Sequence, residues 1–135
     1  MSITYYSANR LLDRNFGQTA YTVPTTMYFG LSTTTIQIDG TGATEPSGGN
    51  YARVGVTNDK TSWGIASNGA LTNSVAVTFP ESTASWGTIT HVFISDASSG
   101  GNIWWFDTLS PSRQVQSSTT VLFAIGSITV QMNNS

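Results

Sequence analysis

The chain has 135 residues, a length that suits one domain with a core of its own. It contains no cysteine, which excludes disulfides, thiolate zinc sites and thiol catalysis. The net charge is −2 and the five basic residues are scattered, so there is no basic stripe for a nucleic acid. No apolar run approaches the ~20 residues of a membrane helix, and the first residues lack a signal-peptide pattern. We therefore expect a protein made in a cytoplasm, with neither nucleic acid nor membrane among its partners.

Low charge and abundant hydroxyl groups distinguish the composition. Only 9% of the residues are charged, while Ser and Thr number 18 and 21; average proteins have about 25% charged residues. A neutral, hydroxyl-rich surface can be desolvated at low cost against another protein. An interface protein and an ordinary β domain fit this composition equally well.

The first predicted element is a short helix over residues 7–16. Ser7 can cap its N-terminus, Leu11 and Leu12 supply an apolar face, and Gly17 follows at the position of a C-cap. We predict that residues 1–17 form an N-terminal arm with this helix, and that residues 18–135 form a β-sandwich domain.

Apolar residues then alternate with polar ones in short runs, which is typical of half-buried strands. The predicted strands cover residues 27–31, 51–56, 75–79, 91–95, 103–106, 121–125 and 128–132. Asn68 and Gly69 predict a tight hairpin turn. Many short strands with one helix predict an all-β fold. We expect an antiparallel β-sandwich, and a jelly roll as its topology.

A polar segment of residues 32–50 interrupts this series. Loops longer than about 12–15 residues are usually functional or mobile, so this one is a candidate binding loop, with a short strand conceivable at residues 36–38. Asp39 and Glu45 lie within it and suggest a calcium site, but their spacing matches no EF-hand loop. We expect no metal and no other cofactor.

Residues suited to catalysis are sparse. His91 is the one histidine and falls in a predicted strand, where a half-buried structural role is far more common than a catalytic one. The chain has no Gly-x-Ser-x-Gly motif, and its acidic residues are dispersed beside turn residues that they can cap. The sequence therefore predicts that the protein is not an enzyme and has no catalytic residues.

Four tryptophans are the most informative large side chains. Trp104 and Trp105 are adjacent on a predicted strand, so their side chains must point to opposite faces of the sheet. One can enter the core, and the other is expected to face solvent, another chain or a ligand. A protein interface is the first interpretation, a partly exposed core residue the second, and a platform for sugar stacking the third.

Several stretches resemble small structural proteins of tailed bacteriophages, which are described as capsid cement or decoration proteins or as tail-fibre-like proteins. The most specific are residues 45–54, Glu-Pro-Ser-Gly-Gly-Asn-Tyr-Ala-Arg-Val, and residues 86–90, Trp-Gly-Thr-Ile-Thr. In the first stretch Arg53 and Tyr51 share a strand face, where guanidinium and ring can pack together. The resemblance implies a virion component without catalytic activity. For four residues the favoured interpretation is that they only maintain the fold: Phe79, Pro80, Trp86 and Gly87.

Two functions follow from the resemblance. The first is a cement protein on the capsid surface of the virion, bound to the major capsid protein and to itself as a dimer or trimer. The alternative is a carbohydrate- or receptor-binding module of a tail fibre or tip, which would be present in far fewer copies. We expect the N-terminal arm and the long loop to bind the partner, and residues 1–6 to be dispensable for the fold. The candidate binding residues are Tyr5, Tyr6, Arg10, Arg14, Trp104 and Trp105.

Overall fold

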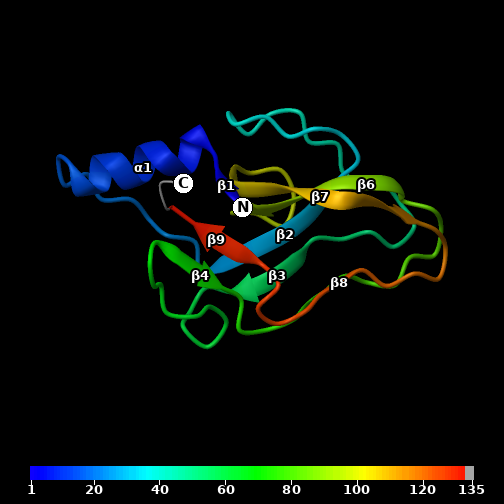
Figure 1. Cartoon of the computed structure of the whole chain (residues 1–135). Helices are drawn as coiled ribbons and strands as arrows, with labels where there is room; N and C mark the ends of the chain where they lie inside the picture. Colours follow the sequence, from blue (N-terminus) through cyan, green and yellow to red (C-terminus); the bar gives the residue numbers. More distant parts are fainter. Residues whose placement is uncertain (133–135) are drawn as a thin grey trace.

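The computed structural model describes residues 1–132, which form an all-β body with one helix, α1 (Tyr5–Asn15) (Figure 1). The strands are β1 (Ser2–Ile3), β2 (Thr26–Ser32), β3 (Val54–Thr57), β4 (Ala70–Thr72), β5 (Val77–Thr78), β6 (Gly87–Ser95), β7 (Ile103–Val115), β8 (Leu122–Phe123) and β9 (Thr129–Gln131). Five strands form an antiparallel sheet in the order β1-β7-β6-β2-β3, and the others form the ladders β4-β9 and β5-β8.

The two ladders pack against one face of the five-stranded sheet and enclose the core. In the sheet register Phe29 lies opposite Ile94, and Ile94 lies opposite Trp105. Direct antiparallel partners point to the same face, so these side chains form one apolar strip. Val77 of β5 and Ile128, just before β9, are buried in the same cluster. The predicted all-β, sandwich-like fold is confirmed.

The jelly-roll topology is not confirmed. A jelly roll distributes eight strands over two sheets, whereas the described strands form one five-stranded sheet and two short ladders. Strand β7 also continues well beyond the predicted residues 103–106. Its second half is mostly polar and exposed, and it stays extended because its backbone pairs with β6, from Gly87↔Val115 to His91↔Thr108.

Helix α1 and residues 33–50 cover the other face of the sheet. In Figure 1 the helix and the cyan loop lie on the upper side, while β4 and β8 lie on the lower side. Phe93, the neighbour of Ile94 on β6, points to this second face and is fully buried. Its ring lies against Gly30, where a Cβ atom would overlap the ring. Position 30 therefore requires glycine for close approach.

The helix begins two residues earlier than predicted. Thr4, rather than Ser7, is the N-cap, and its Oγ1 accepts a hydrogen bond from the Ser7 N–H at 3.3 Å. The Thr4 Oγ1 also donates to the Ile103 carbonyl at 2.7 Å, so a contact distant in sequence fixes the start of the helix. At the other end the Phe16 N–H donates to the Leu12 carbonyl, and Gly17 follows with a positive φ of 116°.

The first residues are part of the sheet rather than a detached arm. Ser2 and Ile3 pair with Phe106 and Trp105 of β7. The Met1 amino group donates to the Thr129 carbonyl at 2.7 Å. These contacts argue against the expectation that residues 1–6 are dispensable for the fold, because their removal would leave this edge of β7 unpaired.

Residues 33–50 form an ordered loop held by internal hydrogen bonds. The Thr33 N–H donates to the Thr44 carbonyl at 2.9 Å, and the Gln37 N–H donates to the Thr41 carbonyl at 2.8 Å. Ile36 is buried, but the conceivable strand over residues 36–38 does not form. The predicted turn at Asn68-Gly69 does form, with both residues at positive φ between bridged Ser67 and Ala70.

Candidate functional site

Three side chains, which we call the Arg53 clamp, tie the long loop to the sheet: Glu45, Tyr51 and Arg53. The Arg53 guanidinium donates to both carboxylate oxygens of Glu45 at 2.9 Å. The Tyr51 hydroxyl donates to Glu45 at 2.7 Å and accepts from the Leu31 N–H at 2.9 Å. The remaining donors of Arg53 reach Ser95 and two backbone carbonyls, and its guanidinium lies 5.0 Å from the centre of the Phe93 ring. Tyr51 and Arg53 thus meet through Glu45.

The electrostatics of the clamp follow from these contacts. Burial opposes ionisation of Glu45, but the hydrogen bonds from Arg53 and Tyr51 outweigh it, so the pKa of Glu45 is lower than usual. Burial and the neighbouring Glu45 carboxylate raise the pKa of Tyr51. Glu45 is therefore charged and Tyr51 neutral at pH 7, and each polar atom of the clamp has a partner.

The second specific stretch packs onto the first. The Trp86 indole N–H donates to the Gly49 carbonyl at 2.8 Å, and the ring packs edge-on against Tyr51 at 5.3 Å between centroids. Gly49 has a φ of 58°, and a Cβ there would lie 3.0 Å from the indole nitrogen. Phe79 is buried and stacks on Tyr51. The residues that carry the phage resemblance therefore hold the fold together, as the structural interpretation predicted.

The candidate residues of the N-terminal segment separate into a half-buried and an exposed group. Half-buried Tyr6 packs edge-on against Trp104 at 5.5 Å, and half-buried Arg10 lies 4.4 Å above the Tyr6 ring. Tyr5 and Arg14 are exposed on the helix. Whether any of these residues binds a partner stays a prediction.

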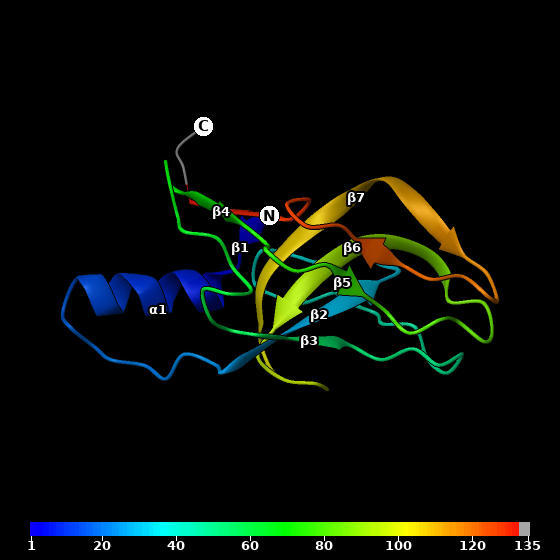
Figure 2. The ribbon, with the colours of Figure 1, turned by 90° about the horizontal axis from the view of Figure 1, so that it is seen from below.

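The end of helix α1 carries two exposed apolar side chains four residues apart, Leu12 and Phe16, which we call the helix tip; Val23, on the segment that follows, is exposed as well. Phe16 is 79% exposed, and Leu12 and Val23 are each more than half exposed. Figure 2 shows that the helix extends beyond the end of the sheet and that the chain returns from it to β2. The tip is therefore accessible from several sides.

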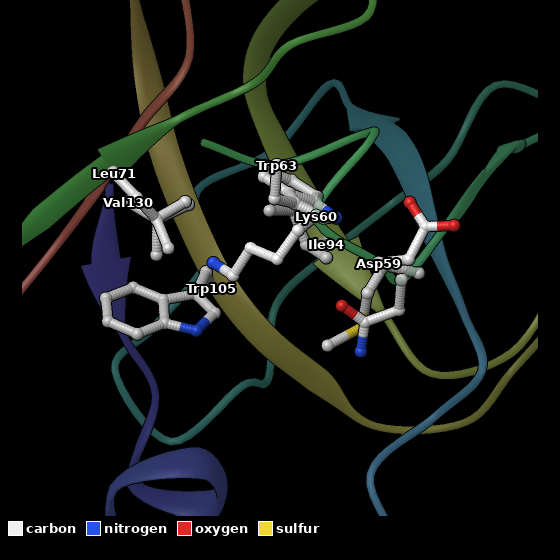
Figure 3. A pocket seen from close by; sticks show the side chains of 9 residues that line it. Asp59, Lys60, Trp63, Leu71, Ile94, Trp105 and Val130 are labelled. Atoms are coloured by element: carbon white, nitrogen blue, oxygen red, sulfur yellow. The ribbon is translucent and has the colours of Figure 1, made fainter. Parts of the chain in front are cut away.

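A pocket of about 300 Å³ opens on the core side of the sheet, between the β4-β9 ladder and strands β2, β6 and β7 (Figure 3). We call it the tryptophan pocket. It is lined by Met27, Asn58, Asp59, Lys60, Trp63, Leu71, Ile94, Trp105 and Val130. In Figure 3 the Lys60 side chain extends between the indoles of Trp63 and Trp105.

The two adjacent tryptophans of β7 point to opposite faces as predicted, but both are buried. Trp104 is 5% exposed beneath helix α1, and Trp105 is 8% exposed in the tryptophan pocket. The expectation of one outward-facing ring is wrong because both faces of the sheet are covered. A long apolar run could have suggested this, since strands buried on both faces lack alternation.

The indole N–H groups of the four tryptophans differ in their partners. Those of Trp86 and Trp104 donate to the Gly49 carbonyl at 2.8 Å and to the Asp96 carboxylate at 3.1 Å. That of Trp63 is buried without a hydrogen-bond partner, and that of Trp105 has none among the described residues. Buried tryptophans usually find an acceptor, so the Trp63 indole N–H is an exception, whereas that of Trp105 is not among the buried unpartnered atoms. Sequence alone carries no signal of this difference.

Candidate catalytic and metal-binding groups do not converge. His91 is buried, with ring nitrogens 2.8 Å from the Thr90 hydroxyl and 3.3 Å from that of Thr108, and burial lowers its pKa against the opposing charge of Asp107. The Asp39 carboxylate accepts from Thr41, and Glu45 belongs to the clamp. Within residues 1–132, no three His, Asp or Glu side chains are grouped as a metal would require. None of the helices described there is long and apolar enough to span a bilayer.

A second pocket, of about 570 Å³, lies between the outer half of β7 and the segment around β8. Apolar and hydroxyl side chains line it, and Arg113 is its one charged lining residue. It contains no tryptophan. It is larger than the tryptophan pocket and has one charged group, where the tryptophan pocket has two.

These features define a small β-sandwich-like domain with one helix. Residues 2–131 match the family model described as "Podophage GP4 fiber I protein gp80", and the chain belongs to this family. It is therefore a small structural protein of a tailed bacteriophage, as the resemblance implied. No curated protein matches the chain significantly.

Proposed function

We propose that the protein is a subunit of a phage fibre rather than a capsid cement protein. The observation that carries this proposal is the family match, which spans residues 2–131 and names a fiber protein. The capsid-decoration interpretation, with the major capsid protein as partner, lacks comparable support. The dispersed acidic residues and the buried His91 further favour a role without catalysis.

The helix tip is the proposed attachment point. Its Leu12 and Phe16 side chains are exposed and apolar at the end of an element that projects from the body. Exposed apolar patches on otherwise polar proteins commonly mark contacts with other subunits. The partner is another fibre subunit, either a second copy of this chain or a different virion protein.

Labelling of the intact virion tests the location. The phage is grown with a short epitope tag after residue 132, and the tag is detected with gold-labelled antibody by electron microscopy. We expect a few labels per particle, all on fibres. Many labels spread over the capsid would overturn the proposal and restore the cement interpretation.

A pair of variants tests the attachment point. Leu12→Ser combined with Phe16→Ser removes the apolar surface of the helix tip, and we expect at least a tenfold loss of the protein from purified virions. Ile65→Ser is the matched control, because Ile65 is 86% exposed on a different loop. Equal incorporation of both variants would show that the helix tip is not the anchor.

A further inference from the structure

One face of helix α1 is apolar and exposed along its length. Leu12 and Phe16 lie one helical turn apart, because the Phe16 N–H donates to the Leu12 carbonyl. Tyr5 is seven residues before Leu12 and therefore lies on the same face, and more than half of its surface is exposed. Side chains at spacings of four and seven are the anchors with which an amphipathic helix enters an apolar groove. This face thus has the pattern of a helix that docks into another surface.

The charged residues at the end of the helix lie on different sides of it. Successive helical residues are about 100° apart, so Asp13 lies next to the face that carries Leu12 and Phe16. Arg14 lies about 200° from Leu12 and is directed away from that face. Both charged residues are exposed, and neither forms an ion pair within residues 1–132. A molecule that covers the apolar face therefore meets one carboxylate at its border.

The pocket between the outer half of β7 and the segment around β8, which we call the β7-β8 pocket, complements this face. Its apolar lining includes Leu109, Val121 and Leu122, and Leu122 is 57% exposed. Arg113 is exposed at this pocket and forms no ion pair with a described residue. The volume of about 570 Å³ lies within the range of about 300–1,000 Å³ in which proteins enclose small ligands, so it has room for two side chains.

The apolar helix face and the β7-β8 pocket lie toward opposite ends of the molecule. Figures 1 and 2 both show helix α1 extending from one end, whereas the last residues of β7 and strand β8 lie toward the other. The helix tip therefore meets this pocket only on a neighbouring molecule. A contact between two different surfaces of identical subunits is heterologous, and it repeats as an open row unless the rotation between subunits closes a ring.

We propose that copies of the protein associate head to tail, with the helix tip of one copy in the β7-β8 pocket of the next. Leu12 and Phe16 are then removed from water, and Asp13 faces Arg113 of the partner subunit. Opposite charges across the contact favour this orientation. A symmetric contact between two helix tips lacks this match, because each tip brings the same Asp13. The inference rests on the attachment role proposed for the helix tip and identifies its partner as a second copy of this chain.

Sedimentation velocity of the purified full chain at increasing protein concentration tests the association. We expect monomers to give way to dimers and then to larger species. A tip variant, Leu12→Ser with Phe16→Ser, should weaken association about tenfold or more, because it removes the apolar anchors. A pocket variant, Leu122→Ser with Arg113→Asp, should have a similar effect. Ile65→Ser, at an exposed apolar position on another loop, is the control and should associate like the parent.

Mixing variants distinguishes a head-to-tail contact from a symmetric one. The tip variant keeps an intact pocket and the pocket variant keeps an intact tip, so an equimolar mixture contains one complete interface. We expect this mixture to form dimers that do not grow further, at concentrations where each variant alone is monomeric.

An exchange of charges tests the predicted ion pair at positions that are exposed in the free protein. Asp13→Arg alone and Arg113→Asp alone should each weaken association about twofold to tenfold, because each places like charges opposite one another. Their equimolar mixture should recover the association of the parent, since every contact between alternating copies then joins opposite charges.

Three results would overturn the proposal. They are a monomeric parent protein at every concentration, no dimers in the mixture of tip and pocket variants, and association that is lost in the tip variant but kept in the pocket variant. The last result would identify a symmetric contact between helix tips. Circular dichroism during thermal unfolding checks that each variant is folded. None of these results bears on the location of the protein in the virion, which gold labelling decides independently.

Discussion

The Arg53 clamp and the tryptophan pocket lie on opposite faces of the same sheet and differ in how their polar groups are satisfied. Phe93 and Ile94 are neighbours on β6, and one packs beneath the Arg53 guanidinium while the other lines the pocket. In the clamp, both oxygens of Glu45 and the Tyr51 hydroxyl have partners at 2.7–2.9 Å. In the pocket, the buried indole N–H of Trp63 has no partner among the described residues.

Buried polar groups affect stability differently according to whether they have hydrogen-bond partners. A fully bonded network restrains the chain, because every alternative arrangement loses hydrogen bonds in a poorly solvated environment. An unpartnered buried donor makes no such restraint and lowers the stability of the fold. The polar groups of the clamp are therefore expected to contribute more to stability than those of the pocket.

The largest expected effect comes from breaking the clamp. Arg53→Ala leaves the Glu45 carboxylate partly buried without its cation and removes three bonds to the 95–100 turn region. We expect the free energy of unfolding to fall by about 3 kcal/mol, as for other buried ion pairs that lose one member. Urea denaturation measures this change. Arg14→Ala, at an exposed position, is the control and should stay within about 0.5 kcal/mol of the parent.

The second largest loss of stability is expected from substitutions of the two adjacent tryptophans of β7. Trp104→Phe removes a hydrogen bond to Asp96 that helps to keep the pKa of that carboxyl low against burial, so it should cost about 2 kcal/mol. Trp105→Phe removes similar volume without a lost hydrogen bond and should cost about 1 kcal/mol. Thermal unfolding of both variants shows which substitution destabilises the protein more. A larger loss for Trp105→Phe would show that the pocket contributes more to folding than the comparison implies.

Acid should weaken the clamp. The pKa of Glu45 is lower in the folded protein than its ordinary value of 4.5, so the unfolded chain binds more protons as the pH falls. The stability from Glu45 is complete above about pH 5 and is lost as the pH falls through the folded-state pKa, with an expected loss on the order of 1 kcal/mol. Glu45→Gln should flatten this part of the curve of melting temperature against pH. Glu81→Gln, at an exposed site, should follow the parent.

The smallest stability effect is expected at the helix tip. Leu12 and Phe16 are exposed, so replacing both with Ser should change the free energy of unfolding by about 0.5 kcal/mol or less. Circular dichroism during thermal unfolding measures it. A large destabilisation would mean that the helix depends on these side chains, and reduced incorporation into virions would then no longer indicate a lost contact.

Several features of the fold could be predicted from local pattern. Alternation identified β2, β3 and β6, because a half-buried strand places every second side chain in the core. The turn at Asn68-Gly69 followed from the positive φ angles that these two residue types tolerate. The helix was found with its start displaced by two residues, because Thr4 is selected as the cap through its bond to the distant Ile103 carbonyl.

The candidate site was predicted less well. Tyr6, Arg10 and Trp104 were identified as binding residues, but Tyr6 packs against both of the others within the chain, and Trp104 is buried. Arg and aromatic residues are favoured both at interfaces and in intramolecular clusters, so residue type cannot separate these roles. Trp63 was not singled out, because, unlike Trp86, it lies in none of the stretches that carry the phage resemblance.

The sequence by itself determined the fold class, the short helix, the lack of thiol chemistry and the phage resemblance, because each depends on composition or on residues close together in the chain. Only the tertiary structure decided which side chains complete their hydrogen bonds. Glu45 meets Arg53 because a loop folds back onto the sheet, and Trp63 meets Trp105 because β4, β9 and β7 converge around them. Whether a buried donor finds an acceptor depends on atoms far apart in the sequence, and local pattern carries no information about them.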